Sequence, residues 1–216
     1  TVTNSFSQTG GNVAMAGNVS VTQGGRALNV GNVSGTSVSL LSQNGGIFLN
    51  GVVSATGTGD VLLIRTDKLV NNYGALSLIA PNGRWLVYSS DPAQDSRNGL
   101  AYSFKQYNTT YGGTVQGTGN GFLYSIAPVL TPGLIGEVQK TYDGTNAATL
   151  AAGNYTVSGA IDGDTILLNY PSAGTYDSKH VATGKAVTVT GITLASAKEG
   201  ATLVYGYGMS SNTASA

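Results

Sequence analysis

The one histidine of this chain, His180, is the natural starting point for a search for chemistry. It follows closely after Asp177 and Ser178, and these three residue types make up the Ser-His-Asp arrangement of many hydrolases. The chain has no cysteine, so Cys-His catalysis and cysteine-ligated zinc are both excluded. Because the three residues lie in a stretch with strand-like alternation, we interpret them as a polar exposed edge and expect no catalysis there.

Two aspartates could instead serve a glycoside hydrolase. Asp91 and Asp95 stand close in sequence to Trp85 and Tyr88, and paired carboxylates cleave glycosidic bonds in most such enzymes. Both aspartates lie in a polar loop that contains proline, where Asp commonly caps turns by accepting from nearby backbone N–H groups. Turn capping is therefore the prediction that we favour for this pair.

Metal and cofactor sites find little support in the sequence. Asp162 and Asp164 could donate oxygens to Ca²⁺, but a dedicated calcium loop needs a longer series of oxygen ligands. We predict a turn between strands at this point. The glycine cluster at 119–121 lacks a following helix and a Lys-Ser/Thr pair, so it also predicts a turn and not a phosphate cradle. We expect no cofactor and no metal.

Two lysines suggest covalent chemistry of a different kind. Lys140 or Lys185 could join an Asn side chain in a stabilising isopeptide bond, with the loss of one ammonia that an intact mass would reveal. The sequence alone does not place the required carboxylate beside either lysine. The cross-link therefore stays a hypothesis.

Short strands are the elements that must carry all these residues. Between Asn18 and Ala80 the chain repeats an alternating apolar ladder closed by Gly, Asn, Thr or Ser, and the inward series begin at Val19, Val38, Val61 and Leu76. Each ladder is too short to bury its apolar face alone, so stacked neighbours must form a continuous core, as in a β-solenoid. Further ladders at 28–30 and 47–49 indicate at least two strands per coil. We predict the last coils of a right-handed parallel β-helix.

Composition agrees with this all-β class. The 216 residues include 32 glycines, about twice the usual share of roughly 7%, and Thr, Ser, Asn and Val are frequent. Only 9% of residues are charged, ten basic against ten acidic, so no broad field exists to attract nucleic acid. No run approaches the 18 or more apolar residues of a membrane helix, so no transmembrane segment is expected.

The middle of the chain is rich in aromatic residues. It contains the one tryptophan and a group of tyrosines that includes Tyr88, Tyr102 and Tyr107. Large aromatic side chains bury about 150–250 Å² each, so they could close the apolar end of a solenoid. We favour this capping interpretation, because Trp85 and Val87 alternate so that both point inward. As an alternative, Trp85, Tyr88, Tyr102 and Tyr107 would form a sugar-stacking platform that contacts a glycan.

The last part of the chain is expected to form a separate module. Leu130–Leu134 contains Pro and Gly, which interrupt strand pairing, and we place a domain boundary there. The expected division is therefore solenoid at 1–82, aromatic connecting segment at 83–133 and a small β-rich repeat domain at 134–216, for which a β-grasp-like arrangement is one option. Ala195–Gly200 is expected to hold one helical turn, since Ala, Lys and Glu favour it.

The residues of this last module resemble a known family. Segments similar to the YDG-type repeat module of large bacterial surface proteins are Lys140–Thr145, Gly174–Tyr176, Val181–Val189 and Gly191–Leu194. Gly83–Pro92 and Phe104–Tyr107 resemble the segment that joins that module to the β-helix of filamentous-haemagglutinin-like exoproteins. The family's closing phrase is altered here to Gly200–Tyr205, a departure from the family pattern that falls on the last strand of the module.

The resemblance implies a secreted adhesin at the bacterial cell surface or outer membrane, exported with an outer-membrane partner by two-partner secretion. We expect a non-enzymatic fragment of a longer protein that attaches to a polysaccharide, a host-cell glycan or the biofilm matrix, with the YDG-type module as a spacer. Two alternatives remain open at this stage. One is a polysaccharide-acting β-helix enzyme, and the other is a passive stalk that binds nothing.

Overall fold

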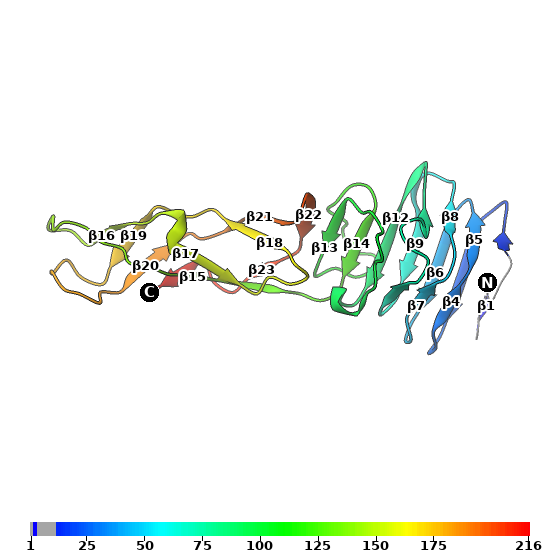
Figure 1. Cartoon of the computed structure of the whole chain (residues 1–216), viewed down its shortest axis with the longest axis horizontal. Helices are drawn as coiled ribbons and strands as arrows, with labels where there is room; N and C mark the ends of the chain where they lie inside the picture. The colour runs from blue at the N-terminus through cyan, green and yellow to red at the C-terminus, as the bar shows by residue number, and fades with distance from the viewer. Residues whose placement is uncertain (1, 4–11) are drawn as a thin grey trace. The chain divides into compact units, whose positions relative to one another are not determined.

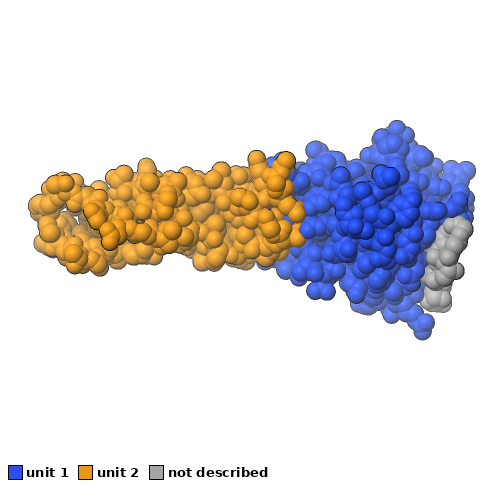
Figure 2. Space-filling view, viewed as in Figure 1, with its two compact units in different colours: residues 1–127, 202–206 blue, residues 128–201, 207–216 orange. Residues whose placement is uncertain are grey.

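The computed structural model describes residues 2–3 and 12–216 and is almost entirely β structure, with 45% of residues in strands and 3% in helices. Two compact units divide the chain, and Figure 2 colours them separately. Unit 1 comprises residues 1–127 and 202–206, and unit 2 comprises residues 128–201 and 207–216. The all-β class expected from the sequence is confirmed.

Unit 1 contains about three turns of a β-solenoid, in which parallel strands stack in successive rungs (Figure 1). The first sheet stacks β1 (Val2–Thr3), β3 (Val19–Gln23), β6 (Val38–Ser42), β9 (Gly59–Arg65) and β12 (Gly83–Ser89). The second sheet stacks β4 (Leu28–Val30), β7 (Ile47–Leu49) and β10 (Leu69–Asn71). The third stacks β2 (Asn12–Ala14), β5 (Asn32–Gly35), β8 (Val53–Ala55) and β11 (Leu78–Ile79). A full turn thus contains three strands, one more than the two ladders that the sequence revealed.

Alternation of inward apolar and outward polar residues builds the solenoid core. Val19 pairs with Val38 in the next rung and Val21 pairs with Leu40, and all four side chains are buried. Stacking one rung on the next therefore places equivalent apolar positions above one another and removes them from water together. The inward assignments of Val19 and Val38 are confirmed.

Two predicted ladder positions differ from the structure. The first is Val61, whose side chain is buried as predicted, but a β-bulge lies here in the pairing with β12, and Leu62 is the residue stacked on Val38. The second is Leu76, which is 68% exposed, so its predicted inward orientation is wrong. The rung above β9 is instead β12, in which Trp85 pairs with Leu62. The alternation around Leu76 resembled a ladder, but only Leu78 and Ile79 form a strand there.

The aromatic segment continues the first sheet. A short 3-10 helix, η1 (Pro92–Gln94), follows β12, and then come β13 (Phe104–Gln106) and β14 (Gly121–Tyr124). The order in space is β12, β14, β13, because the later strand lies between the two earlier ones. β22 (Thr202–Tyr205) then pairs in parallel with β13, so the last rung of unit 1 comes from a distant part of the sequence.

The ring of Phe104 packs directly on glycine in this region. A Cβ atom at Gly121 would lie 2.1 Å from Cζ of Phe104, and a Cβ at Gly117 would lie 2.0 Å from Cγ of the same ring. Phe104 is 1% exposed and belongs to a buried cluster with Leu86 and Leu123. Glycine is therefore required here for space.

Unit 2 consists of antiparallel and short parallel pairs. Its strands are β15 (Val129–Leu134), β16 (Ala147–Thr149), β17 (Tyr155–Ser158), β18 (Thr165–Leu168), β19 (Ala173–Tyr176), β20 (Val187–Thr190), β21 (Leu194–Glu199), β23 (Gly208–Met209) and β24 (Thr213–Ser215). β15 pairs with β17 and β23, β18 pairs with β21, and β16, β19, β20 and β24 form a four-stranded sheet. Leu150, Leu168, Val189 and Ile192 lie in its core.

Three local predictions for this region are corrected. Pro132 and Gly133 do not interrupt pairing, because Thr131–Leu134 forms most of β15 and pairs with β17. β23 pairs only with Val129 and Leu130, so an N–H at Pro132 is not needed on that side. The helical turn expected at 195–200 is wrong, because β21 pairs there with β18 and this pairing overrides helix propensity. A β-grasp-like arrangement needs a helix across the sheet, and the only helix described in this unit is η2 (Ala152–Asn154), a single 3-10 turn.

Candidate functional site

Three of the four aromatic residues expected to contact a glycan are buried, and two of them, Trp85 and Tyr107, are almost fully enclosed. Trp85 is 2% exposed and makes an edge contact with Phe122, with ring centroids 5.3 Å apart. Tyr107 is 1% exposed and stacks on Tyr124 at 5.8 Å. A ring with no exposed face has no surface on which a sugar could stack, so the predicted glycan contacts of Trp85 and Tyr107 do not fit this structure.

Of the other two predicted residues, Tyr88 is also buried and Tyr102 is half-buried. Tyr102 is half-buried, and its hydroxyl accepts a hydrogen bond from Nη1 of Arg97 at 2.7 Å. Tyr88 is 9% exposed, and burial, followed by the nearby Asp60 carboxylate, raises its pKa. The exposed ring of this region is Tyr111, which is 52% exposed and contacts the ring of Tyr88 at 5.4 Å. Sequence reasoning missed Tyr111, although the two glycines that follow it mark a turn that exposes its side chain.

The turn capping predicted for the two aspartates of the candidate hydrolase pair holds for Asp91 but is wrong for Asp95, which accepts a hydrogen bond from the backbone of a distant strand. Asp91 accepts a hydrogen bond from the N–H of Ala93 at 2.9 Å and thereby caps η1, which confirms the predicted role. One oxygen of Asp95 accepts from the N–H of Leu69 at 2.7 Å and from the hydroxyl of Ser89 at 2.8 Å. Burial raises the pKa of Asp95 to about 6, although both hydrogen bonds oppose this change.

A shallow hollow lies on the outer face of the third solenoid sheet. Its volume is about 320 Å³, and it is lined by Asn12, Val13, Ala14, Asn32, Val33, Ser34, Val52, Ser54 and Tyr73. Asn32 donates from Nδ2 to Oδ1 of Asn12 at 2.9 Å, and its own Oδ1 accepts from the N–H of Val52 at 2.8 Å. Tyr73 is 51% exposed. The hollow therefore offers amide and hydroxyl groups and an aromatic ring without any charge.

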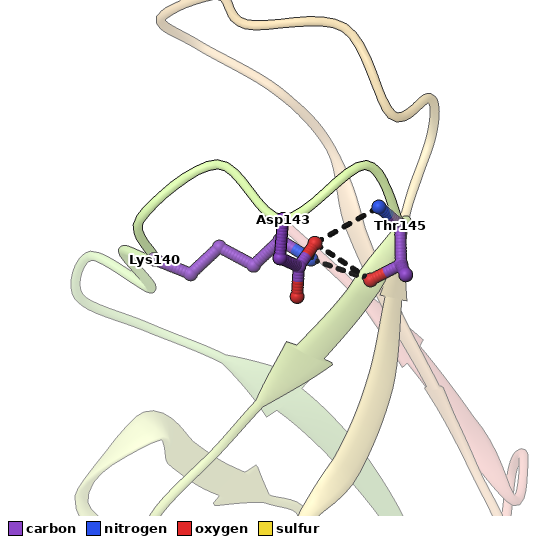
Figure 3. Close-up of polar contacts among 3 residues, drawn as sticks. All are labelled: Lys140, Asp143 and Thr145. Atoms are coloured by element: carbon purple, nitrogen blue, oxygen red, sulfur yellow. Dashed lines mark hydrogen bonds and ion pairs between the residues drawn. The ribbon is translucent and has the colours of Figure 1, made fainter.

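A cluster of polar side chains forms around the Tyr142-Asp143-Gly144 turn of unit 2 (Figure 3). Nζ of Lys140 lies 2.7 Å from Oδ1 of Asp143 and donates to Oγ1 of Thr145 at 2.8 Å. The same carboxylate oxygen accepts from the N–H of Thr145 at 2.9 Å. Hydrogen bonds from Lys140 and then from Thr145 lower the pKa of Asp143 to about 2. Gly144 has φ = 78°, so its predicted positive φ is confirmed.

A second ion pair, between Lys185 and Asp177, also lies in unit 2. Nζ of Lys185 lies 2.5 Å from Oδ1 of Asp177 and donates to the hydroxyl of Ser178 at 2.6 Å. The hydrogen bond from Lys185 lowers the pKa of Asp177. Within the part of the chain that the structure describes, Ser178 and Asp177 are therefore joined through Lys185, and His180 is not the residue that links them.

These two clusters border one pocket of about 560 Å³. It is lined mainly by residues 134–145 and 178–187, together with Tyr176 and Ala216. Its charged lining side chains are Glu137, Lys140, Lys179 and Lys185. This pocket is the most developed candidate functional site of unit 2.

The calcium and isopeptide hypotheses can be compared with these contacts. The N–H of Asp164 donates to the carbonyl of Ile161 at 3.1 Å, as expected for a turn, and Oδ2 of Asp164 accepts from the hydroxyl of Tyr207 at 2.9 Å. Among residues 2–3 and 12–216, no group of three or more His, Cys, Asp or Glu side chains could hold a metal ion. Lys140 and Lys185 contact aspartate carboxylates and hydroxyl groups, and the part of the chain that the structure describes brings no Asn side chain to either of them.

The fold and this site define a class before any comparison is made: a β-solenoid followed by a small β unit with a charged, turn-lined pocket. Residues 127–206 match the sequence model of a family described as the YDG domain, which confirms the YDG-type resemblance of this region. No curated protein and no solved structure matches the chain. In the described residues, no helix has the length and apolar character needed to span a membrane.

Proposed function

We propose that this chain is part of a large secreted bacterial surface adhesin, in which the solenoid attaches to a glycan and the YDG domain acts as a spacer. The match at residues 127–206 and the solenoid fold support this proposal, since both belong to the resemblance with filamentous-haemagglutinin-like exoproteins. Export by two-partner secretion and residence at the cell surface or in the biofilm matrix are parts of the same proposal.

One observation carries the adhesive role. The hollow on the third sheet presents Asn32, Ser34 and Ser54 from neighbouring rungs, with the exposed ring of Tyr73 beside them. Parallel rungs repeat about every 4.8 Å, so equivalent hydrogen-bonding groups recur along the solenoid axis. Uncharged amides and hydroxyls with an aromatic ring are suited to a neutral sugar chain. Weak contacts repeated along such a surface add through effective concentration.

The aromatic segment contributes to the core of unit 1 and not to its binding surface. Trp85, Phe104 and Phe122 are all buried in unit 1 and would exclude water from the end of the apolar stack. An open solenoid end exposes unpaired backbone and apolar side chains, so it must be covered. We assign a closing function to this segment, and glycan contact to the hollow on the third sheet.

A glycan array with the purified chain tests the proposal. The wild-type protein should bind at least one neutral oligosaccharide in a saturable way, and Tyr73→Ala should lose that binding while its circular dichroism is unchanged. Tyr142→Ala is a matched control, because Tyr142 is 61% exposed but lies in unit 2. Absence of binding to every glycan would refute adhesion by this segment and would favour the passive stalk.

A further inference from the structure

Charge is concentrated around the pocket of unit 2 in a chain that has little of it. The whole sequence contains ten basic and ten acidic residues. Three lysines and one glutamate line this pocket, and the carboxylates of Asp143 and Asp177 hold two of those lysines without belonging to the lining. The charged lining side chains, three lysines and one glutamate, are therefore mainly cationic, whereas the two aspartates behind them balance the charge of the whole cluster.

Two of the lysine ammonium groups are held in place by hydrogen bonds that do not use all of their N–H donors. An ammonium group has three N–H donors. Lys140 directs two of them to Asp143 and Thr145, and Lys185 directs two to Asp177 and Ser178. Among the contacts of the described residues, each lysine therefore keeps one N–H for a further acceptor. The carboxylates lower the conformational freedom of these long side chains before any ligand arrives, which reduces the entropy that binding must remove.

The rim of the pocket is apolar and exposed. Tyr142 is 61% exposed, Val181 is 81% exposed and Ile135 is 50% exposed. Tyr176 forms part of the wall, where its hydroxyl donates to the carbonyl of Val138 at 2.7 Å and so fixes the ring. A ligand that accepts hydrogen bonds from the lysines and also has an apolar face would contact both the charged and the apolar residues of this pocket.

We propose that this pocket binds a carboxylated sugar residue of an acidic polysaccharide. The sugar carboxylate would accept hydrogen bonds from the remaining donors of Lys140 and Lys185 and from Lys179, and the C–H face of the ring would lie on Tyr142. The volume of about 560 Å³ falls within the range of roughly 300–1,000 Å³ that is usual for small-molecule sites. An inorganic anion would use the lysines but would leave the apolar rim exposed.

This inference gives the YDG domain a binding role beyond the spacer role proposed above. It also separates two ligands by charge: a neutral glycan for the solenoid hollow and an acidic glycan for the pocket of unit 2. Either site can therefore fail without affecting the other.

Isothermal titration of the whole chain with oligogalacturonate, and with a neutral galactose oligomer of equal length, tests the inference. Lys179→Gln and Tyr142→Ala should each weaken binding of oligogalacturonate about fivefold or more, since each removes one of the two kinds of contact. Lys198→Gln should leave the affinity unchanged, because Lys198 is an exposed lysine of the same unit that does not line the pocket. Binding should also weaken as salt is raised from 50 to 300 mM.

Three results would overturn the inference. The first is no binding of oligogalacturonate by the wild-type protein. The second is binding that survives both Lys179→Gln and Tyr142→Ala. The third is equal competition by inorganic sulfate, which would show recognition of charge alone. Loss of acidic-glycan binding in the pocket variants, with neutral-glycan binding retained on the array, would confirm that the two sites are independent.

Discussion

Asp95 is expected to destabilise unit 1 at neutral pH, and Asp95→Asn should relieve this effect. Its carboxylate is buried and accepts hydrogen bonds from Leu69 and Ser89. Asparagine keeps an oxygen for both donors and has nearly the same shape, but it carries no charge. The substitution therefore removes the cost of burying an ion while it preserves the hydrogen bonds.

The magnitude follows from the pKa. Burial raises the pKa of Asp95 from 3.8 to about 6 in the folded protein. One pKa unit corresponds to about 1.4 kcal/mol, so keeping this group ionised at pH 7 costs the fold about 3 kcal/mol relative to its protonated form. Between pH 4 and pH 6 the folded chain binds this proton more tightly than the unfolded chain does. The stabilisation that the fold gains from holding Asp95 in its protonated form is therefore fully present below pH 4 and is lost as the pH rises through 6.

Urea unfolding at pH 4, 5, 6 and 7 measures this effect. Trp85 is the one tryptophan and lies buried in unit 1, so its fluorescence reports on the right part of the molecule. Asp95→Asn should be more stable than wild type at pH 7, by up to about 3 kcal/mol, and the two should converge at pH 4. Asp91→Asn, which retains a capping side chain in the same loop, is the control and should follow the wild-type pH profile. An Asp95→Asn variant that is less stable than wild type at pH 7 would refute the reasoning.

Other substitutions test the packing and the charge cluster. Gly121→Ala should destabilise unit 1 by about 1–3 kcal/mol in thermal unfolding, because its Cβ would overlap the ring of Phe104, and adding Phe104→Leu should recover part of the loss. Leu40→Ala should cost about 2–5 kcal/mol, whereas Leu76→Ala should change stability by less than about 0.5 kcal/mol, since the first side chain is buried and the second exposed; similar losses for both would contradict the solenoid register. In carbon-detected NMR titration the carboxyl of Asp143 should stay ionised until about pH 2, so that its ion pair is lost only as the pH falls through that value; a titration near pH 4 would show that the pair does not form in solution.

The solenoid could be predicted from sequence because its pattern is local. Val19, Val38 and their neighbours alternate with polar residues, and the stacked rungs bury the same positions. The bulge at Val61 could not be predicted, because residues on either side of an inserted residue still alternate between apolar and polar. The exposure of Leu76 could not be predicted either, because a short loop can show the same alternation as a strand. Trp85 was expected to point inward, and its burial follows from that pattern.

The pairing of strands that lie far apart in the chain was the main feature that could not be predicted from the sequence. Ala195–Gly200 has residues that favour a helix, yet β18 supplies a partner strand and the segment is extended. The pocket of unit 2 was missed for a similar reason. Lys140 and Lys185 were identified as reactive candidates, but their partners, Asp143 and Asp177, became visible only when the turns that hold them were in place.

The return of the chain to unit 1 has a consequence for how such proteins are assembled from parts. Residues 202–206 lie within the YDG match but belong to the first unit, where Leu203–Tyr205 pair with Phe104–Gln106. A gene segment that encodes only residues 127–206 would therefore carry a strand away from its partner. Such a segment would need a neighbouring unit that offers an unpaired parallel strand edge for residues 203–205. The segment that matches the family and the compact unit of the structure therefore have different boundaries.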